Sequence, residues 1–216
     1  MLRICLYSLI FLFSQNVLAQ EWAFDVYLDK TKMGTHTFTL NDENQLTSRA
    51  KFNVKVLFIN AYSYNHVSIE QWKDGCLSSI EAETTENKVM TKVTGKRNGE
   101  QFNVTNGTQV QTLPACVMTF AYWNPKTLTQ TKLLNPQNAE YLNTNIKLLG
   151  REAIDVKGSK TEAVHYLLQG FSEGKAKSEE KIKLNIDLWY DQNNNWVALQ
   201  STTPDGYKIT YKLIKS

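Results

Sequence analysis

Residues 46–59 read LTSRAKFNVKVLFI, and this stretch decides the fold class. Its apolar side chains recur at every second position, at Ala50, Phe52, Val54, Val56 and Phe58. The positions between them hold Lys51, Asn53, Lys55 and Leu57. A period of two is typical of a β-strand, because successive side chains point to opposite faces. The stretch therefore predicts a strand with one face in a core and the other in water.

The same alternation continues on both sides of this strand. Towards the N-terminus, Phe24, Val26 and Leu28 share a face, and the turn-like residues 29–34 lead into a returning strand with His36, Phe38 and Leu40. On the other side, one face of the next strand carries Tyr62, Tyr64, His66, Ser68 and Glu70. Short alternating stretches then follow to residue 105 and resume from 143 to 213. This succession predicts a series of antiparallel hairpins.

Roughly a dozen short strands joined by tight turns indicate an all-β fold. We expect an antiparallel meander that forms a strongly curved half-barrel or a closed barrel, with a sandwich as the alternative. An outer-membrane barrel also shows alternation, but it needs an apolar outer band and strands near 10 residues long. Here Lys and Asn populate the second face of the strands, and many strands are shorter. The chain is therefore not expected to span a membrane.

Residues 113–125, LPACVMTFAYWNP, break the alternation. Pro114 suits the first turn of a helix, and Pro125 disfavours a helical conformation at Asn124. These signals predict one short helix near residues 115–123. Such a helix would be apolar nearly all round, so it has to be buried against the inner face of the sheet.

Residues 1–19 have the features of a cleavable signal peptide. Arg3 precedes an apolar run from Ile4 to Phe13, and Val17-Leu18-Ala19 ends in a small residue. The run is about half the length of a membrane-spanning helix. Cys5 lies inside it, so no lipid anchor is expected. The remaining residues, 20–216, are predicted to form a single β domain in the periplasm.

The two remaining cysteines, Cys76 and Cys116, form an even pair. In an exported protein such a pair favours a disulfide, although two separate buried thiols remain the alternative. No second cysteine or histidine stands near either residue at a spacing typical of zinc ligands. No metal site is predicted here.

Several short motifs resemble a family of uncharacterised bacterial envelope proteins. They are Trp22-x-Phe24-x-Val26-x-Leu28-Asp29, Gly34-x-His36-x-Phe38, Trp72-x-x-Gly75-Cys76-Leu77, the central CVMTFAYWNP at 116–125, Leu188-Trp189-Tyr190 and Trp196-Val197-Ala198-Leu199. The resemblance covers nearly all of residues 20–216. It implies an envelope location and a β fold, but no activity, since the family is a domain of unknown function. More distantly, the meander is similar to exported half-barrel domains that include lipoprotein carriers, and a fold alone does not transfer function.

Charge and composition exclude some partners. The chain of 216 residues has a formal net charge of +3, and its basic residues are scattered or interleaved with acidic ones. A nucleic-acid-binding surface would be a patch of one sign, so no nucleic-acid partner is expected. No cofactor motif is present in the sequence.

The histidines His36, His66 and His165 all stand within strand patterns, and no two have the close spacing of a metal motif. His66 and Glu70 lie on one strand face about 13 Å apart, too far for direct contact. A hydrolase-like enzyme that uses His66 or His36 is a further hypothesis. No residue stands out as the nucleophile of such an enzyme.

The leading hypothesis is a non-enzymatic binder of an apolar molecule, such as a lipid or a fatty acyl chain. Its candidate ligand-binding residues come from the predicted helix and are Met118, Phe120, Tyr122 and Trp123. The same residues also suit a core that is simply filled by the protein's own side chains. This alternative is the scaffold hypothesis, in which the partner is an envelope protein. A large apolar cavity favours the binder, whereas a closely packed interior favours the scaffold.

Overall fold

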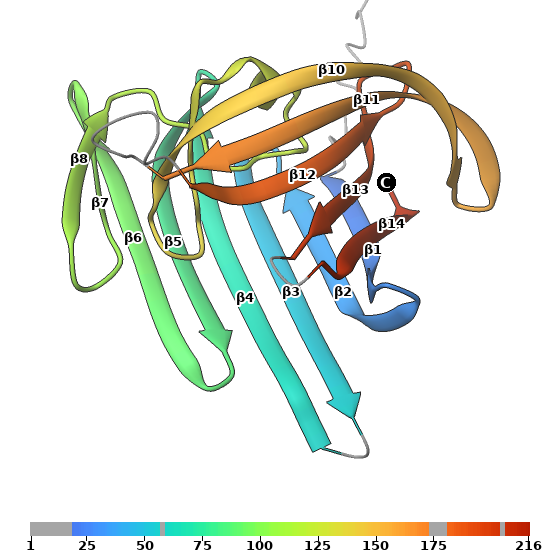
Figure 1. Ribbon diagram of the computed structural model, residues 1–216. Helices are drawn as coiled ribbons and strands as arrows, with labels where there is room; N and C mark the ends of the chain where they lie inside the picture. The colour runs from blue at the N-terminus through green and yellow to red at the C-terminus, as the bar shows by residue number, and fades with distance from the viewer. Residues whose placement is uncertain (1–18, 57–58, 173–180, 204–205) are drawn as a thin grey trace, which may run out of the picture.

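The computed structural model describes residues 19–56, 59–172, 181–203 and 206–216 (Figure 1). The predicted signal peptide therefore lies outside the described residues, except for Ala19. Cys5 lies outside them as well.

Fourteen strands make up one sheet in this part of the chain. They are β1 (Gln20–Leu28), β2 (Thr31–Leu40), β3 (Gln45–Val56), β4 (Ile59–Lys73), β5 (Cys76–Glu86), β6 (Val89–Asn98), β7 (Gln101–Thr105), β8 (Val110–Pro114), β9 (Lys132–Leu134), β10 (Tyr141–Val156), β11 (Ser159–Phe171), β12 (Ile182–Tyr190), β13 (Trp196–Thr202) and β14 (Lys208–Lys215). All neighbouring strands are antiparallel, so the predicted all-β meander is confirmed.

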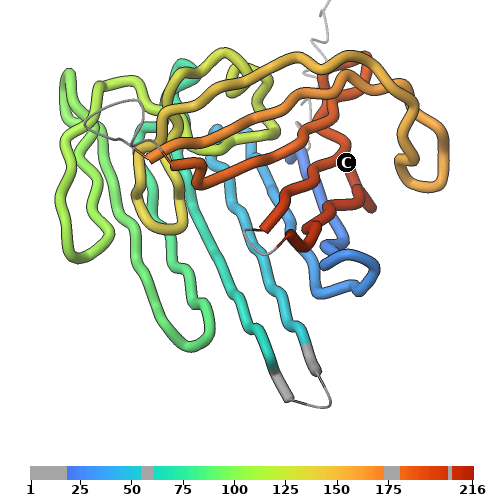
Figure 2. Tube along the Cα trace, viewed as in Figure 1, coloured from blue at the N-terminus to red at the C-terminus, as the bar shows by residue number. Residues whose placement is uncertain are grey.

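The chain starts in the middle of the sheet and fills it from there to both edges. Strands β1 to β8 run outward in order, the chain then crosses to the opposite edge at β9, and β9 to β14 return until β14 pairs with β1. The edge strands β8 and β9 are not paired with each other, so the sheet is curved but open. Figures 1 and 2 show β10, β11 and β12 arching across the upper end of the long strands β3 to β6. The half-barrel form of the prediction therefore describes the molecule.

The alternation that predicted β3 is confirmed by burial. Ala50 and Phe52 are buried, whereas Lys51 and Asn53 are exposed. The long strands β3 and β4 pair along almost their whole length, from Gln45 opposite Gln71 to Val56 opposite Ile59. One face of each strand therefore lines the inside of the curved sheet.

Aromatic rings pack against one another inside the curved sheet. The ring of Phe24 lies 4.3 Å from that of Trp196, and the ring of Phe38 lies 5.2 Å from it. Trp196 comes from β13, on the other side of the β1–β14 pair, so these contacts hold the two halves of the sheet together. Such ring pairs add to the stability that burial alone provides.

Gly34 on β2 permits a close approach of β3. A Cβ atom at this position would collide with the backbone carbonyl oxygen of Lys51. Because the obstacle is backbone, it cannot move aside as a flexible side chain would. The close packing of β2 against β3 thus requires a glycine at position 34.

The prediction of a helix near residues 115–123 is wrong. These residues contain bends and turns, and the helical turn in the described parts of the chain is the 3₁₀ helix η1 (Pro125–Thr129). Asn124 caps it by accepting a hydrogen bond from the backbone N–H of Lys126. Pro114, predicted to open a helix, instead ends the edge strand β8, a position that tolerates proline.

The physical reason is that the carbonyls of Val117 and Met118 accept hydrogen bonds from strands instead of from N–H groups of the same segment. The carbonyl of Val117 accepts from the N–H of Leu77 on β5 at 2.8 Å, and that of Met118 accepts from the N–H of Leu134 on β9, also at 2.8 Å. Carbonyls used in this way are not available for a helical ladder. The segment consequently connects β5 with β9 across the open side of the sheet.

A disulfide between Cys76 and Cys116 anchors the start of this segment to β5, with an S–S distance of 2.01 Å. The structure thus contains the predicted bridge. It fixes Cys116, which directly precedes residues 117–123, to the first residue of β5.

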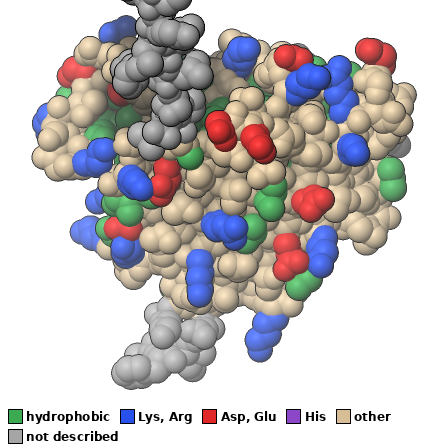
Figure 3. Space-filling model, turned by 180° about the vertical axis from the view of Figure 1, so that it is seen from behind, with side chains coloured by type: hydrophobic (Ala, Val, Ile, Leu, Met, Phe, Trp, Pro, Cys, Tyr) green, Lys and Arg blue, Asp and Glu red, His purple; other side chains and the backbone are tan. Residues whose placement is uncertain are grey.

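The outer surface carries charges of both signs. Figure 3 shows Lys and Arg side chains interspersed with Asp and Glu over the face seen from behind, without a large patch of one sign on that face. Among the described residues, no helix is both long enough and apolar enough to cross a membrane.

Candidate functional site

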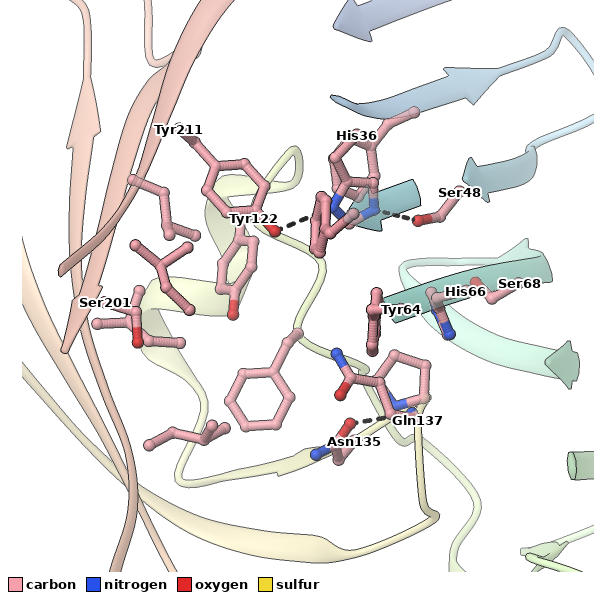
Figure 4. Close-up of a pocket in the computed structure, with 18 of the residues that line it drawn as sticks. His36, Ser48, Tyr64, His66, Ser68, Tyr122, Asn135, Gln137, Ser201 and Tyr211 are labelled. Atoms are coloured by element: carbon pink, nitrogen blue, oxygen red, sulfur yellow. Dashed lines mark hydrogen bonds between the residues drawn. The ribbon is translucent and has the colours of Figure 1, made fainter. Parts of the chain in front are cut away.

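A cavity of about 760 Å³ lies inside the curved sheet. Strands β2, β3 and β4 form one wall, and β12, β13 and β14 form the opposite one. Residues 119–123 and 135–137 lie between the walls. Figure 4 shows Ser201 on one wall and His66 with Ser68 on the other, with Asn135 and Gln137 between them.

Stacked aromatic rings line the β4 side of the cavity. The ring of Tyr64 stacks on Phe52 at 5.2 Å, and the rings of Tyr62 and His66 follow it along β4 at 6.4 and 6.3 Å. These side chains are two residues apart on one strand, so they all face inward. The opposite wall contributes the aliphatic side chains of Leu184, Ile186, Leu199 and Ile209, together with the hydroxyl-bearing residues Ser201, Thr203, Tyr207 and Tyr211.

The cavity has an open and a closed end. Its lining residues Ala61, Glu86, Gln137 and Tyr207 are exposed and mark the opening. At the closed end Ser68, Glu70 and Thr119 are at most 3% exposed. The polar groups at the closed end are therefore shielded from bulk water.

Glu70 is the central polar group of the closed end. Its Oε2 accepts a hydrogen bond from the Thr119 hydroxyl at 3.0 Å, and its Oε1 accepts one from Ser68 at 3.4 Å. Burial raises the pKa of the Glu70 carboxyl from 4.5 to about 7, although the hydrogen bonds that it accepts lower that pKa in part. At neutral pH a large fraction of Glu70 is consequently an uncharged carboxylic acid.

His36 forms a second polar cluster in the cavity wall. Its Nε2 lies 2.7 Å from the Ser48 hydroxyl, and its Nδ1 lies 3.2 Å from the Tyr211 hydroxyl, as Figure 4 shows. Burial lowers the pKa of His36 well below 6.5, and the nearby His66 lowers it further. The ring is therefore neutral at pH 7, so one of its nitrogens donates and the other accepts.

His66 is also neutral at pH 7. Burial lowers its pKa from 6.5 to about 4, and its Nδ1 lies 2.9 Å from the Thr84 hydroxyl. The two ionisable carboxyls that line the cavity are Glu70 and Glu86, and no Lys or Arg is found among its described lining residues. The described lining thus carries no positive charge at neutral pH.

Three of the four predicted ligand-binding residues line the cavity. They are Phe120, Tyr122 and Trp123, whereas Met118 is buried in the core beside it. The Trp123 ring packs 6.1 Å from Trp22 and 5.5 Å from Trp72, so it belongs to both the core and the cavity wall. The plug and ligand-binding interpretations therefore overlap in this segment.

The predicted histidines separate into two groups. His36 and His66 lie in the cavity wall, although each bonds to a different hydroxyl. His165 is not among the cavity-lining residues, and it lies 2.7 Å from Asp187 and 3.1 Å from Glu152. No group of three or more potential metal ligands occurs in the described parts of the chain.

Sequence reasoning missed Ser48, Glu70 and Tyr211 as site residues. The available signal was the row of polar residues on the inward face of β4, which alternates with Val67 and Ile69 on the outer face. Polar side chains on a face that also carries Tyr64 and Trp72 indicate a cavity wall better than a closely packed core.

Comparison with protein families gives one match over most of the chain. A model described as a domain of unknown function, DUF6134, matches residues 24–214. The chain belongs to the DUF6134 family. The predicted membership of an uncharacterised family is confirmed, and comparison with curated proteins gives no match.

Solved structures show what the DUF6134 fold is similar to. A beta-barrel-like protein of the domain of unknown function DUF1849 from Brucella abortus has a TM-score of 0.67 at 14% identity, over 92% of this chain and 97% of that one. LprF from Mycobacterium bovis has a TM-score of 0.33 at 12% identity, over 90% of this chain and 84% of that one. The first likeness concerns the fold alone, and the second is too low to support an argument.

Proposed function

We propose that this protein binds an apolar molecule, such as a lipid or a fatty acyl chain, inside its curved sheet and does not transform it. The observation that carries the proposal is the cavity of about 760 Å³. Small-molecule sites are mainly apolar cavities of about 300 to 1,000 Å³ with a few polar groups. Each methylene buried there would contribute about 0.8 kcal/mol before ordering costs are subtracted.

The scaffold hypothesis is less well supported by the interior. A protein whose sheet is filled by its own side chains has a closely packed core with few voids larger than a water molecule. The space between β4 and β14 is much larger than that. An envelope protein as partner stays a prediction, and it is compatible with a bound lipid.

Hydrolysis is the second candidate, because Ser48 and His36 lie 2.7 Å apart in the cavity wall. Two features rank it lower. His36 has the Tyr211 hydroxyl at its other nitrogen and not a carboxylate. Ser48 also lies in the middle of β3, paired with Phe38 and Ser68, where backbone N–H groups serve the sheet and not an oxyanion hole. Labelling of Ser48 by a fluorophosphonate probe, and its loss in Ser48→Ala, would favour hydrolysis.

We propose the periplasm as the location, on the basis of residues 1–19 in the sequence. Apolar molecules of the cell envelope are abundant there and would be the available ligands. The disulfide between Cys76 and Cys116 suits an oxidising compartment.

The proposal is tested by extracting protein that was purified gently from its native envelope. Mass spectrometry of the solvent extract should reveal an enriched apolar molecule. Ser201→Phe places a bulky ring in the cavity and should reduce the amount carried, since Ser201 lies between Ile186 and Ile209 on the cavity wall. Trp123→Ala should reduce it as well, because Trp123 lines the cavity.

Thr202→Phe is the matched control, because Thr202 is the next residue on β13 and is exposed. It should carry as much as the wild type. Extracts without any enriched molecule, together with tryptophan fluorescence that does not respond to added methyl myristate, would reject the proposal in favour of the scaffold.

A further inference from the structure

The cavity has a chemical polarity that bears on which amphiphile it can hold. This inference rests on the proposed function and concerns the polar end of the ligand. We infer that the closed end of the cavity, formed by Glu70, Thr119 and Trp123, binds the uncharged oxygen-bearing end of an amphiphile, such as an alcohol, an ester or a ketone. A fatty-acid anion should bind less tightly, because no described lining residue supplies a positive charge.

The first argument comes from charge. The described lining residues include two carboxyls, Glu70 at the closed end and Glu86 at the opening, and no Lys or Arg. The imidazoles of His36 and His66 are kept neutral by burial, which lowers the pKa of each. An anionic head group in the cavity would have no opposite charge to replace its hydration, and buried unpaired charges are strongly disfavoured. At the opening it would meet Glu86.

The second argument comes from unused hydrogen-bonding capacity. The indole Nε1 of Trp123 is buried and has no hydrogen-bond partner among the described residues. A buried N–H without an acceptor destabilises the protein, so an acceptor supplied by a ligand is favoured there. Trp123 lines the cavity, and its ring lies 5.5 Å from the ring of Trp72. Trp72 stands two residues after Glu70 on β4, so Trp123 lies at the closed end of the cavity.

Glu70 adds a donor at the same end. Thr119 and Ser68 donate to its two oxygens. Burial raises its pKa to about 7, and the protonated form carries an O–H that can donate to a ligand oxygen. An uncharged polar end with free lone pairs can therefore accept from the protonated Glu70 or from the Trp123 N–H, while the apolar chain lies along the rings of β4.

The apolar lining determines the direction of the ligand. Phe52, Tyr64 and Leu199 line the cavity between its closed end and its opening. A chain with its polar end at Glu70 would contact these side chains and extend towards Tyr207 at the opening. The reverse orientation would place methylenes against the polar groups at Glu70 and leave Trp123 without an acceptor.

A matched series of C14 amphiphiles tests this inference. Lipid-free protein is loaded with the uncharged dye Nile red, and 1-tetradecanol, methyl myristate, myristate and tetradecyltrimethylammonium each compete with the dye at pH 7. The alcohol and the ester should bind at least tenfold more tightly than myristate. Trp123→Phe should weaken the alcohol and the ester several-fold but leave tetradecane unchanged, since the alkane has no oxygen. Circular dichroism establishes that the variant is folded.

Different failures have different meanings. If myristate or the cation binds as tightly as the alcohol in the wild-type protein, the inference is overturned and the proposed function stands. If neither Nile red nor any amphiphile binds, both are overturned. An equal loss of tetradecane and tetradecanol in Trp123→Phe would show that Trp123 only shapes the cavity, and the assignment of its N–H would be wrong.

Discussion

Replacing Glu70 by Gln should make the protein more stable at high pH and leave it almost unchanged at low pH. Glu70 is buried and has no cationic partner among the cavity-lining residues that the structure describes. Gln has nearly the same shape and keeps an oxygen that can accept from Thr119. It differs in never becoming charged.

The magnitude follows from the pKa of Glu70. Burial raises this pKa from 4.5 in the unfolded chain to about 7 in the folded protein. Between these two values the folded state therefore binds more protons than the unfolded state, so the free energy of unfolding falls as the pH rises. One unit of pKa corresponds to about 1.4 kcal/mol, which gives a loss of about 3 kcal/mol that is complete above pH 7.

His66 contributes in the opposite direction. Burial lowers its pKa from 6.5 to about 4, so the free energy of unfolding rises as the pH rises through this window. Burial lowers the pKa of His36 too, with the same sign. The wild type and Glu70→Gln both retain these histidines, and their contribution cancels in the difference between the two proteins.

Urea unfolding followed by tryptophan fluorescence, with lipid-free protein and an intact disulfide, gives the required free energies. The difference between Glu70→Gln and wild type should be small at pH 4.5 and reach about 3 kcal/mol in favour of the variant at pH 8. Glu81→Gln is the control, because Glu81 is exposed on the next strand, and its difference should not vary with pH in this way. A Glu70→Gln difference that stays constant from pH 4.5 to 8 would refute the reasoning.

Three further predictions concern the disulfide, the packing of β2 against β3 and the cleavage of the signal peptide. Cys76→Ser should lower the free energy of unfolding by about 2 to 4 kcal/mol, because the bridge to Cys116 closes a loop of 40 residues. For the same reason, unfolded wild-type protein without reductant should take up no alkylating reagent. Gly34→Ala should cost about 2 kcal/mol or more in urea unfolding, since its Cβ would meet the Lys51 carbonyl, while Thr35→Ala at the exposed neighbouring position should cost far less. N-terminal sequencing of envelope-purified protein should begin at Gln20 or within a residue or two of it; retention of Met1 would contradict the predicted signal peptide.

The sheet could be predicted because its signal is local. A period of two in residues such as Ala50 and Phe52 reports which face of a strand is buried, and each turn reports an antiparallel neighbour. Whether the sheet closes was not readable in this way. That outcome depends on the pairing of β1 with β14 and on the separation of β8 from β9, which are contacts between distant parts of the chain.

The helix prediction failed for a related reason. The bulky residues from Val117 to Trp123 indicate burial, but they do not reveal which groups satisfy their backbone. Leu77 and Leu134, which belong to β5 and β9, supply hydrogen bonds to Val117 and Met118. Burial was predicted correctly for Val117 and Met118, whereas the conformation was not.

The candidate site was predictable only in part. Phe120 and Trp123 were identified because their segment is apolar and does not alternate. The polar groups were not, since His36 meets Tyr211 across 175 positions of sequence and Glu70 meets Thr119 across 49. The raised pKa of Glu70 arises from burial, which a pattern of residue types does not quantify.

Anomalous diffraction from a bromine atom tests the central claim most directly. Crystals would be grown with 12-bromo-1-dodecanol at a concentration that saturates the dye competition. We expect a bromine peak inside the cavity, between the wall of Tyr64 and the wall of Ile209, with the hydroxyl end towards Glu70. A peak confined to the outer surface, or a cavity closed by its own side chains with no bromine inside, would contradict the account.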